Sequence, residues 1–236
     1  MSTFVLVHGA WHGAWCWEKV VPLLEGAGHE VVAFDLPGHG EDGTPISGLS
    51  MQDYVDRTVG VLDGAAEPVV LVGHSMGGIV ISLAAEARPD RVKRLVYLTG
   101  FLLEDGRNLL SVAEKDEEAI VLPNLVPSEN GGSFTVDNLK DVFYADCPDE
   151  DVRGAEARVV PEPAFAFSTP VSLTEGNFGR VPRAYIECVE DRAIGITAQR
   201  GMHERRPCET VVSMQTSHSP FFSRPEELAG HLAALA

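Results

Sequence analysis

A serine lies between two glycines in the segment Gly73–Gly77, which directly follows the apolar run Val69–Val72 and opens a helical pattern. The spacing G-x-S-x-G between a strand and a helix is typical of a nucleophile elbow, where a strained turn exposes the serine hydroxyl. Free N–H groups at the start of the helix favour negative charge that develops beside Ser75. We therefore predict that Ser75 is a catalytic nucleophile, the alternative being a glycine-rich turn with an idle serine.

A serine hydroxyl is a poor nucleophile at neutral pH, so it needs a histidine base and a carboxylate that orients the base. In proteins with this elbow, the acid and then the histidine follow the nucleophile along the chain. Asp191 comes just after the strand pattern Ala184–Val189, and His218 follows the pattern Thr210–Met214. We predict that Asp191 and His218 complete a triad. Glu190 is an alternative acid, because a shift of one residue would exchange the two roles.

A glycine loop, His8–Gly13, follows the first apolar strand pattern. Acyl transfer requires two backbone N–H donors at the oxyanion, one from the residue after the nucleophile and one from a neighbouring loop. Met76 and Ala10 occupy those two places in the sequence. His8 and His12 suggest a metal site as an alternative, but they lie on a loop without a carboxylate at a matching spacing. We therefore predict an oxyanion hole here and no metal.

Short β-rich apolar runs alternate with longer helical patterns, which is typical of a parallel sheet covered by helices on both faces. The chain is therefore predicted to be an α/β protein with a doubly wound, mostly parallel sheet. The predicted strands are Phe4–Val7, Glu30–Phe34, Val69–Val72, Leu95–Leu98, Ala184–Val189 and Thr210–Met214. The predicted helices are Trp15–Ala27, Met51–Ala65, Gly77–Ala87, Ile194–Arg205 and a last one after Pro225.

The pattern changes in the middle of the chain, where polar, acidic and proline-rich stretches contain no run typical of a central strand. We predict that residues 104–182 form a small, mainly helical cap. This cap is inserted between two parts of the core, residues 1–103 and 183–236. Within the cap we expect helices over Leu109–Ile120 and Val136–Tyr144.

A substrate pocket between the sheet and the cap should be mostly apolar, as small-molecule sites usually are. Aromatic and aliphatic side chains near this junction are the candidates for its lining. For each of them, ordinary packing in the cap core is the alternative. The candidates are Trp11, Phe101, Leu102, Phe134, Phe143, Phe165 and Phe167.

The chain has 236 residues and a formal net charge of −17, from 18 basic and 35 acidic side chains. Because Lys and Arg form no cluster, we expect neither nucleic acid nor an anionic membrane surface as a partner. The four cysteines are far apart, and the N-terminal apolar run is too short for a signal peptide or a membrane span. We therefore expect a cytoplasmic protein with reduced thiols. Homodimer formation stays an open alternative.

The segment Gly38–Gly43 matches G-x-G-x-x-G, the spacing of many dinucleotide-binding loops. Its context does not fit such a loop, because Pro37 precedes it and no helix opens after it. Glu41 and Asp42 would also repel a pyrophosphate. We expect a surface loop beside the active site and no dinucleotide.

Taken together, these residues resemble the α/β-hydrolase superfamily, and more closely its branch of plant methylesterases, hydroxynitrile lyases and related bacterial esterases. The resemblance implies Ser75 as nucleophile, His218 as base and Asp191 as acid. It also implies the amides of Ala10 and Met76 as the oxyanion hole, in agreement with the residues themselves. It spans nearly the whole chain through Phe4–Ala10, His12–Trp17, Gly28–Val32, Gly73–Gly78, Asp146–Val152, Tyr185–Ile194 and Ser217–Pro220.

Two positions separate hydrolases from lyases in this branch. The lyases carry a threonine in the first loop and a lysine directly after the catalytic histidine, whereas this sequence has Gly9 and Ser219. Without a cation to stabilise departing cyanide, lyase chemistry is disfavoured. We therefore predict a serine hydrolase that cleaves a small apolar or aromatic carboxylic ester through an acyl-enzyme, without a cofactor. A hydroxynitrile lyase and a small-molecule receptor on the same fold are the alternatives.

Overall fold

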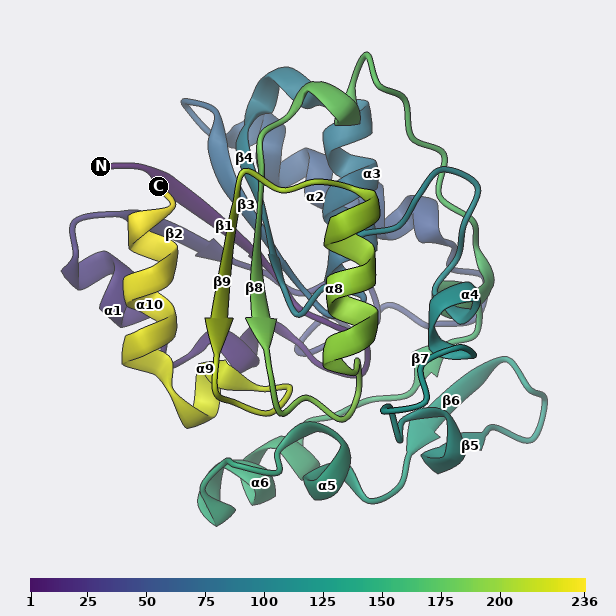
Figure 1. Cartoon of the computed structure of the whole chain (residues 1–236). Coiled ribbons are helices and arrows are strands. Elements are labelled where there is room, and N and C mark those ends of the chain that lie inside the picture. The colour runs from purple at the N-terminus through teal and green to yellow at the C-terminus, as the bar shows by residue number, and fades with distance from the viewer.

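The computed structural model describes all 236 residues and centres on a six-stranded sheet whose strands are all parallel (Figure 1). The strand order is β2-β1-β3-β4-β8-β9. Its order reverses at β1, so the C-terminal strand ends form the crevice where doubly wound sheets bind ligands. The strands cover Thr3–Val7 (β1), Glu30–Ala33 (β2), Val69–His74 (β3), Val92–Leu98 (β4), Arg183–Cys188 (β8) and Thr210–Met214 (β9).

Helices cover both faces of this sheet, which confirms the predicted fold class. Right-handed crossovers place α1 and α10 together on one face and α2, α3 and α8 on the other (Figure 1). The short helix α9 precedes α10. These helices cover Val21–Gly26 (α1), Met51–Gly64 (α2), Gly77–Ala87 (α3), Ile196–Arg205 (α8), Pro220–Ser223 (α9) and Pro225–Ala234 (α10).

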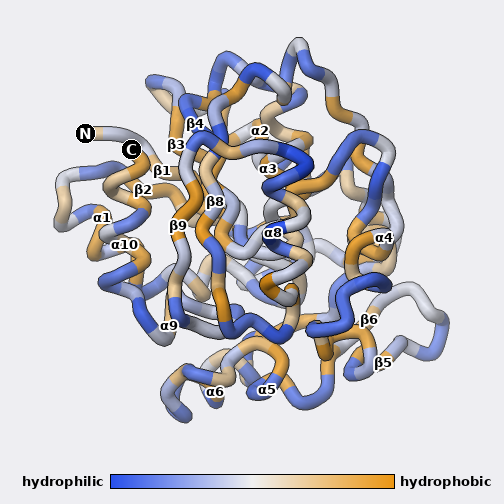
Figure 2. Tube along the Cα trace, viewed as in Figure 1, coloured by the Kyte–Doolittle hydropathy of each residue, from blue (hydrophilic) through white to orange (hydrophobic).

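The central strands form the apolar core. Every residue of β3 is buried, and so are Phe4–Val7 of β1. Hydrophobic residues gather along the strands, and hydrophilic ones gather along the connections at the rim of the molecule (Figure 2). This pattern is expected for a parallel sheet that is buried on both faces. The packed core therefore fixes the strand ends, and with them the side chains that follow each strand.

Residues 104–182, which we call the cap, connect the neighbouring strands β4 and β8. Its helices α5 and α6 lie beyond the C-terminal ends of β8 and β9 (Figure 1). The cap also contains a three-stranded antiparallel sheet that the sequence did not predict. Its elements are Leu110–Ala113 (α4), Leu125–Pro127 (β5), Ser133–Val136 (β6), Leu139–Phe143 (α5), Asp149–Glu156 (α6), Glu162–Pro163 (β7) and Phe165–Ser168 (α7).

The helix expected over Leu109–Ile120 is wrong beyond its first turn, since only α4 is helical there. The chain turns away because Asp116 accepts a hydrogen bond from the backbone N–H of Gly195, at 2.7 Å. The helix expected over Val136–Tyr144 shortens to α5, because Val136 pairs in the antiparallel sheet. Both errors come from contacts with residues outside the predicted helix, which a helical pattern does not reveal.

The helix expected over Trp15–Ala27 is divided into a 3₁₀ turn, Ala14–Trp17, and the short helix α1. Pro22 explains the division, because proline has no N–H to donate and its ring clashes with a preceding helical turn. It is tolerated here in the first turn of α1. Residues 18–20, between the 3₁₀ turn and α1, therefore form a turn instead of a continuous helix.

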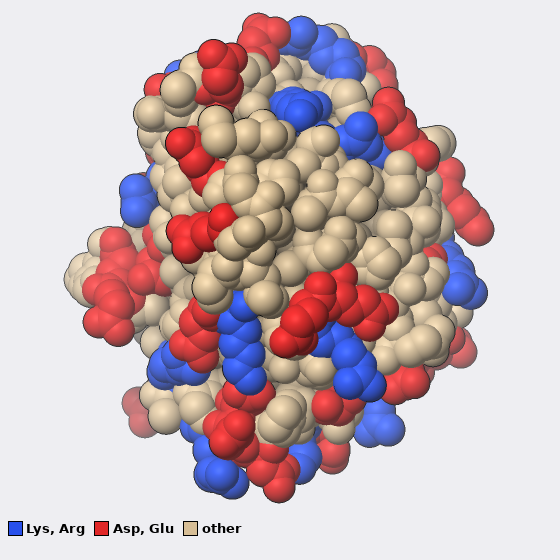
Figure 3. All heavy atoms as spheres, turned by 90° about the vertical axis from the view of Figure 1, so that its left-hand side faces the viewer, with Lys and Arg blue, Asp and Glu red and all other residues tan.

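Acidic and basic side chains interleave on the face shown in Figure 3, around a broad area without charges. No continuous basic patch is visible there. None of the helices is long and apolar enough to cross a lipid bilayer.

Candidate active site

Ser75 lies in the tight turn between β3 and α3, with a positive φ of 53°. Neighbouring strand ends hold this strained backbone. The Ser75 N–H donates to the carbonyl of Leu98 at 3.3 Å, and its own carbonyl accepts from Phe101 N–H at 3.0 Å. A Cβ at Gly77 would come within 2.6 Å of the His8 carbonyl oxygen, so only glycine fits beside this turn. The turn thus has the geometry expected of a nucleophile elbow.

His218 and Asp191 are in contact, as their order in the sequence predicts. The Nδ1 atom of His218 lies 2.6 Å from the Oδ2 atom of Asp191. Nδ1 must carry the proton of this bond, because the carboxylate can only accept. The Nε2 atom of a neutral His218 therefore keeps its lone pair. Glu190, the alternative acid, is exposed and makes no side-chain hydrogen bond.

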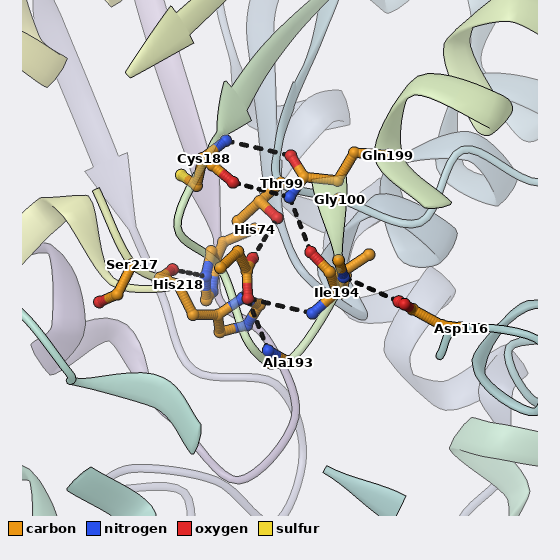
Figure 4. A network of polar contacts seen from close by, with 12 residues as sticks. His74, Thr99, Gly100, Asp116, Cys188, Ala193, Ile194, Gln199, Ser217 and His218 are labelled. Carbon is orange, nitrogen blue, oxygen red and sulfur yellow. Dashed lines mark hydrogen bonds and ion pairs between the residues drawn. The ribbon is translucent and has the colours of Figure 1, made fainter. Parts of the chain in front are cut away.

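The buried carboxylate of Asp191 is fully hydrogen-bonded. Oδ2 accepts from the Thr99 hydroxyl at 2.6 Å as well as from His218. Oδ1 accepts from the backbone N–H groups of Ala193 and Ile194, at 2.6 and 3.0 Å. Figure 4 shows these donors converging from three separate segments. Four donors compensate for the cost of burying the charge and fix the plane of the carboxylate.

Two further residues of this network were not predicted as functional. Gln199 of α8 bridges the carbonyls of Cys188 and Ile194 with its amide nitrogen, at 2.9 and 2.7 Å (Figure 4). It thereby closes the loop that carries the carboxylate. Thr99 adopts a positive φ of 37° directly after β4. A strained threonine after a central strand is a signal that a sequence alone does not reveal.

His74 holds the backbone of the base. Its Nε2 lies 2.9 Å from the carbonyl oxygen of His218, so it donates a proton there. Burial lowers the pKa of His74 well below its ordinary value, which keeps the ring neutral. The Ser75 hydroxyl makes no hydrogen bond to His218 in this structure, and catalytic contacts of this kind often tighten only when substrate binds.

The two predicted oxyanion donors lie next to Ser75. The residues Ala10 and Met76 line the same cavity as Ser75. Neither backbone N–H donates to an acceptor within the protein, although both residues are buried. Buried N–H groups are nearly always paired, so two free ones beside a serine are ready to bind a ligand oxygen.

The histidines of the first loop hold its backbone. The Nε2 atom of His8 accepts from the N–H of Leu36 at 3.1 Å, so its Nδ1 must be the donor to the Gly9 carbonyl at 2.8 Å. Burial lowers the pKa of His8 well below its ordinary value. His8 is therefore a neutral hydrogen-bonding group, and both of its ring nitrogens are used within the protein.

His12 is used in the same way. Its Nδ1 donates to the carbonyl of Ala10 at 2.7 Å, and its Nε2 accepts from the hydroxyl of Tyr144 in the cap at 2.6 Å. Burial lowers the pKa of His12 to about 4, which fits a neutral ring. The loop that carries Ala10 is thus tied to the cap.

Ser75 opens into a narrow apolar cavity of about 20 Å³. Of the predicted lining residues, Trp11, Phe101, Phe143 and Phe167 are in its wall. The rest of the wall consists of aliphatic residues that were not predicted to line it. They are Leu109, Val121, Leu122, Leu125, Ala193 and Ile194.

Three predicted lining residues lie outside this wall. Phe134 packs behind it against the ring of Phe167, with ring centroids 5.6 Å apart, and Phe165 packs against Tyr54 at 5.1 Å. Leu102 instead lines a second hollow of about 470 Å³ between α4 and α8, which does not contain Ser75. The presence of an aromatic side chain in the sequence does not predict whether that residue lines the cavity or packs behind its wall.

Comparisons with known proteins agree with this geometry. The profile of the alpha/beta hydrolase family matches residues 4–231. Methylesterase 2 of Arabidopsis thaliana is 37% identical over 99% of this chain and 95% of its own length. A pyrethroid hydrolase of Sphingobium wenxiniae is 35% identical over 100% of this chain and 88% of its own. The crystal structure of a pyrethroid hydrolase from Sphingobium faniae superposes with a TM-score of 0.86, at 33% identity, covering 99% of this chain and 96% of that one.

Proposed function

Because the chain belongs to the alpha/beta hydrolase family, we propose that it is a serine hydrolase that cleaves small apolar or aromatic carboxylic esters. The observation that carries this proposal is the pairing of His218 with Asp191, which leaves the Nε2 lone pair free to accept the proton of Ser75. The methylesterases and pyrethroid hydrolases among its relatives support the same reaction class.

The reaction proceeds through an acyl-enzyme. Ser75 Oγ attacks the ester carbonyl carbon while its proton passes to His218 Nε2, and Asp191 stabilises the resulting imidazolium. The amides of Ala10 and Met76 bind the oxyanion. Collapse of this intermediate breaks the ester bond, and the imidazolium gives its proton to the leaving alkoxide. Water then attacks the acyl group in the same way and restores the serine.

The cavity favours a small or flat apolar substrate. A space of about 20 Å³ has room for one or two water molecules. An ester therefore enters only when side chains of the wall move outward. The wall offers aromatic faces from Trp11, Phe101 and Phe143 and no charged side chain. We expect charged esters to be poor substrates, because nothing in the wall would replace their hydration.

Hydroxynitrile lyase chemistry has less support. A Cβ at Gly9 would lie 2.8 Å from the Cβ of Ser75, so this backbone has no room for a larger residue in the first loop. Ser219, which follows His218, is fully buried and provides no cation. No positively charged side chain in the cavity wall would stabilise a departing cyanide ion.

The experiment compares wild type with Ser75→Ala on p-nitrophenyl acetate and butyrate. We expect the variant to lose about 10⁴-fold or more in kcat/KM. Equal rates would contradict the hydrolase and favour the alternative, a small-molecule receptor on this fold. Mandelonitrile serves as the lyase control, and release of cyanide that depends on Ser75 would overturn the choice of reaction.

We also propose a cytoplasmic location, which the cysteines support. All four are free, and Cys16, Cys147 and Cys188 are buried. In an oxidising compartment cysteines tend to form disulfides, so four free thiols support a reducing one. Sedimentation of the purified chain tests the open alternative of a homodimer.

A further inference from the structure

Trp11, next to the oxyanion residue Ala10, is held by the cap at three points. Its backbone N–H donates to the carboxylate of Glu162 at 3.0 Å, and its carbonyl accepts from Val160 N–H at 3.0 Å. Its indole N–H donates to the carbonyl of Phe134 at 2.8 Å. Trp11 also has a positive φ of 64°, which costs about 1 to 2 kcal/mol for a residue other than glycine. The cap contacts therefore stabilise a strained backbone.

Glu162 is completely buried, and each of its oxygens is bonded to the core. Oε2 accepts from the Trp11 N–H and lies 2.8 Å from Nε2 of His39, and Oε1 accepts from the Tyr54 hydroxyl at 3.1 Å. These three donors come from the first loop, the loop after β2 and helix α2. A buried carboxylate is expensive without such partners. This one therefore joins the cap to three separate parts of the core.

His39 gives Glu162 a buried positive partner. Both of its ring nitrogens face acceptors, since Nδ1 lies 3.2 Å from the Pro37 carbonyl and Nε2 faces the carboxylate. Burial alone would lower the pKa of His39, but Glu162, with smaller contributions from the Pro37 carbonyl and Asp35, outweighs burial and raises that pKa. The expectation that Gly38–Gly43 is simply a surface loop is wrong at His39, whose side chain is fully buried in this ion pair.

One peptide plane connects Glu162 to the oxyanion hole. The Trp11 N–H and the Ala10 carbonyl belong to the same planar peptide. Glu162 holds the first end of that plane, and His12 holds the second. The preceding peptide is fixed through the Gly9 carbonyl. With both planes fixed, the direction of the Ala10 N–H is fixed as well.

We propose that Glu162 is a positioning residue for the oxyanion hole, and that its carboxylate aims the Ala10 N–H by holding the Ala10–Trp11 peptide from the cap. This inference rests on the proposed esterase function. Without the acceptor, Trp11 relaxes toward negative φ and the peptide rotates. The Gly9–Ala10 peptide is joined to it at the Ala10 Cα and shifts with it, so the Ala10 N–H no longer points at the developing oxyanion. The apolar wall that binds the ester is left in place.

The test is Glu162→Met, which removes the acceptor at similar side-chain size, assayed on p-nitrophenyl butyrate. Removing an oxyanion donor costs about 100- to 1000-fold in rate, and a misdirected donor should cost less. We expect kcat to fall about 10- to 100-fold while KM changes by less than about threefold. Binding of butylboronic acid, whose serine adduct places an oxygen in the oxyanion hole, should weaken by the same factor as kcat. A merely structural role would leave the affinity of the folded variant for butylboronic acid unchanged.

Two other variants make the result decisive. Tyr54→Phe removes only the donor at Oε1, so we expect kcat within about threefold of wild type. The double variant Glu162→Met with His39→Leu removes both charges, and so it leaves no unpaired ion if the single variant fails to fold. Normal kcat in either folded Glu162 variant would overturn the proposal. If wild type itself shows no turnover that depends on Ser75, the proposed function fails instead.

Discussion

The two halves of the active site are held in place by different parts of the molecule. The Asp191 carboxylate takes its hydrogen bonds from core residues only, including His218 and Thr99. The cap also touches the loop of the base, since the centroid of the Phe143 ring lies 5.5 Å from that of the His218 ring. The oxyanion loop is bound by several cap groups. Tyr144 bonds to the His12 ring, Glu162 accepts from the Trp11 N–H, and a cap carbonyl accepts from the Trp11 indole. The carboxylate that supports proton transfer thus depends mainly on the core, whereas stabilisation of the oxyanion depends more strongly on the cap. Changes at Glu162 of the cap should therefore alter kcat without changing the hydrogen bonds of Asp191.

The largest effect is expected on the core side. Asp191→Asn keeps the shape of the side chain but no longer stabilises the imidazolium and favours the wrong tautomer of His218. We expect kcat to fall about 10⁴-fold. Steady-state kinetics on p-nitrophenyl butyrate measures this loss.

Glu190→Gln is the matched control for this substitution, since it changes the neighbouring carboxylate in the same way. We expect its kcat to stay within about twofold of wild type, because Glu190 is exposed. A large loss in Glu190→Gln with little change in Asp191→Asn would exchange the two assignments.

The second effect concerns the cap side and the stability of the fold at low pH. The pKa of His12 is about 4 in the folded protein and near 6.5 in an unfolded chain. Between these values only the unfolded state binds the proton, so stability falls as pH decreases from about 6.5 to 4. We expect His12 to contribute a loss on the order of 3 kcal/mol. Urea unfolding of wild type and His12→Gln at pH 7.5 and pH 4.5 measures it.

Burial also lowers the pKa values of His8 and His74, so wild type and His12→Gln should both lose stability in acid. The variant should lose less than wild type. Identical losses in the two proteins would show that His12 is not buried as a neutral ring.

A smaller effect should come from Thr99→Val, which removes one of the donors to Asp191 and leaves the side-chain shape unchanged. We expect kcat to fall about tenfold, because a hydrogen bond to a charged group contributes at least about 1.5 kcal/mol. Thr58→Val is the control, because Thr58 is equally buried but bonds only to the Tyr54 carbonyl within α2. If the two variants lose equal activity, Thr99 has no specific role in the relay.

Much of the core side could be predicted from the sequence. In a parallel sheet the C-terminal strand ends meet at one edge, so the order of Ser75, Asp191 and His218 was enough to expect them together. The glycine loop after the first strand was likewise enough to predict Ala10 as an oxyanion donor. These features depend on local patterns and on a topology with few alternatives.

The cap side could not be predicted in this way. Glu162 lies in a short proline-flanked strand, and its partners His39 and Tyr54 are far away along the chain. No periodicity or motif signals a contact of that kind. The same holds for Asp116, whose bond to Gly195 ends a helix that the local pattern favours.

The central claim is that the serine, the histidine and the carboxylate act as one proton-relaying unit. Its most direct test measures kcat/KM for Ser75→Ala, His218→Ala and the double variant on p-nitrophenyl butyrate. Residues of one unit are strongly non-additive, so we expect the double variant to keep about the same residual rate as either single one. Losses that multiply in the double variant would contradict the claim.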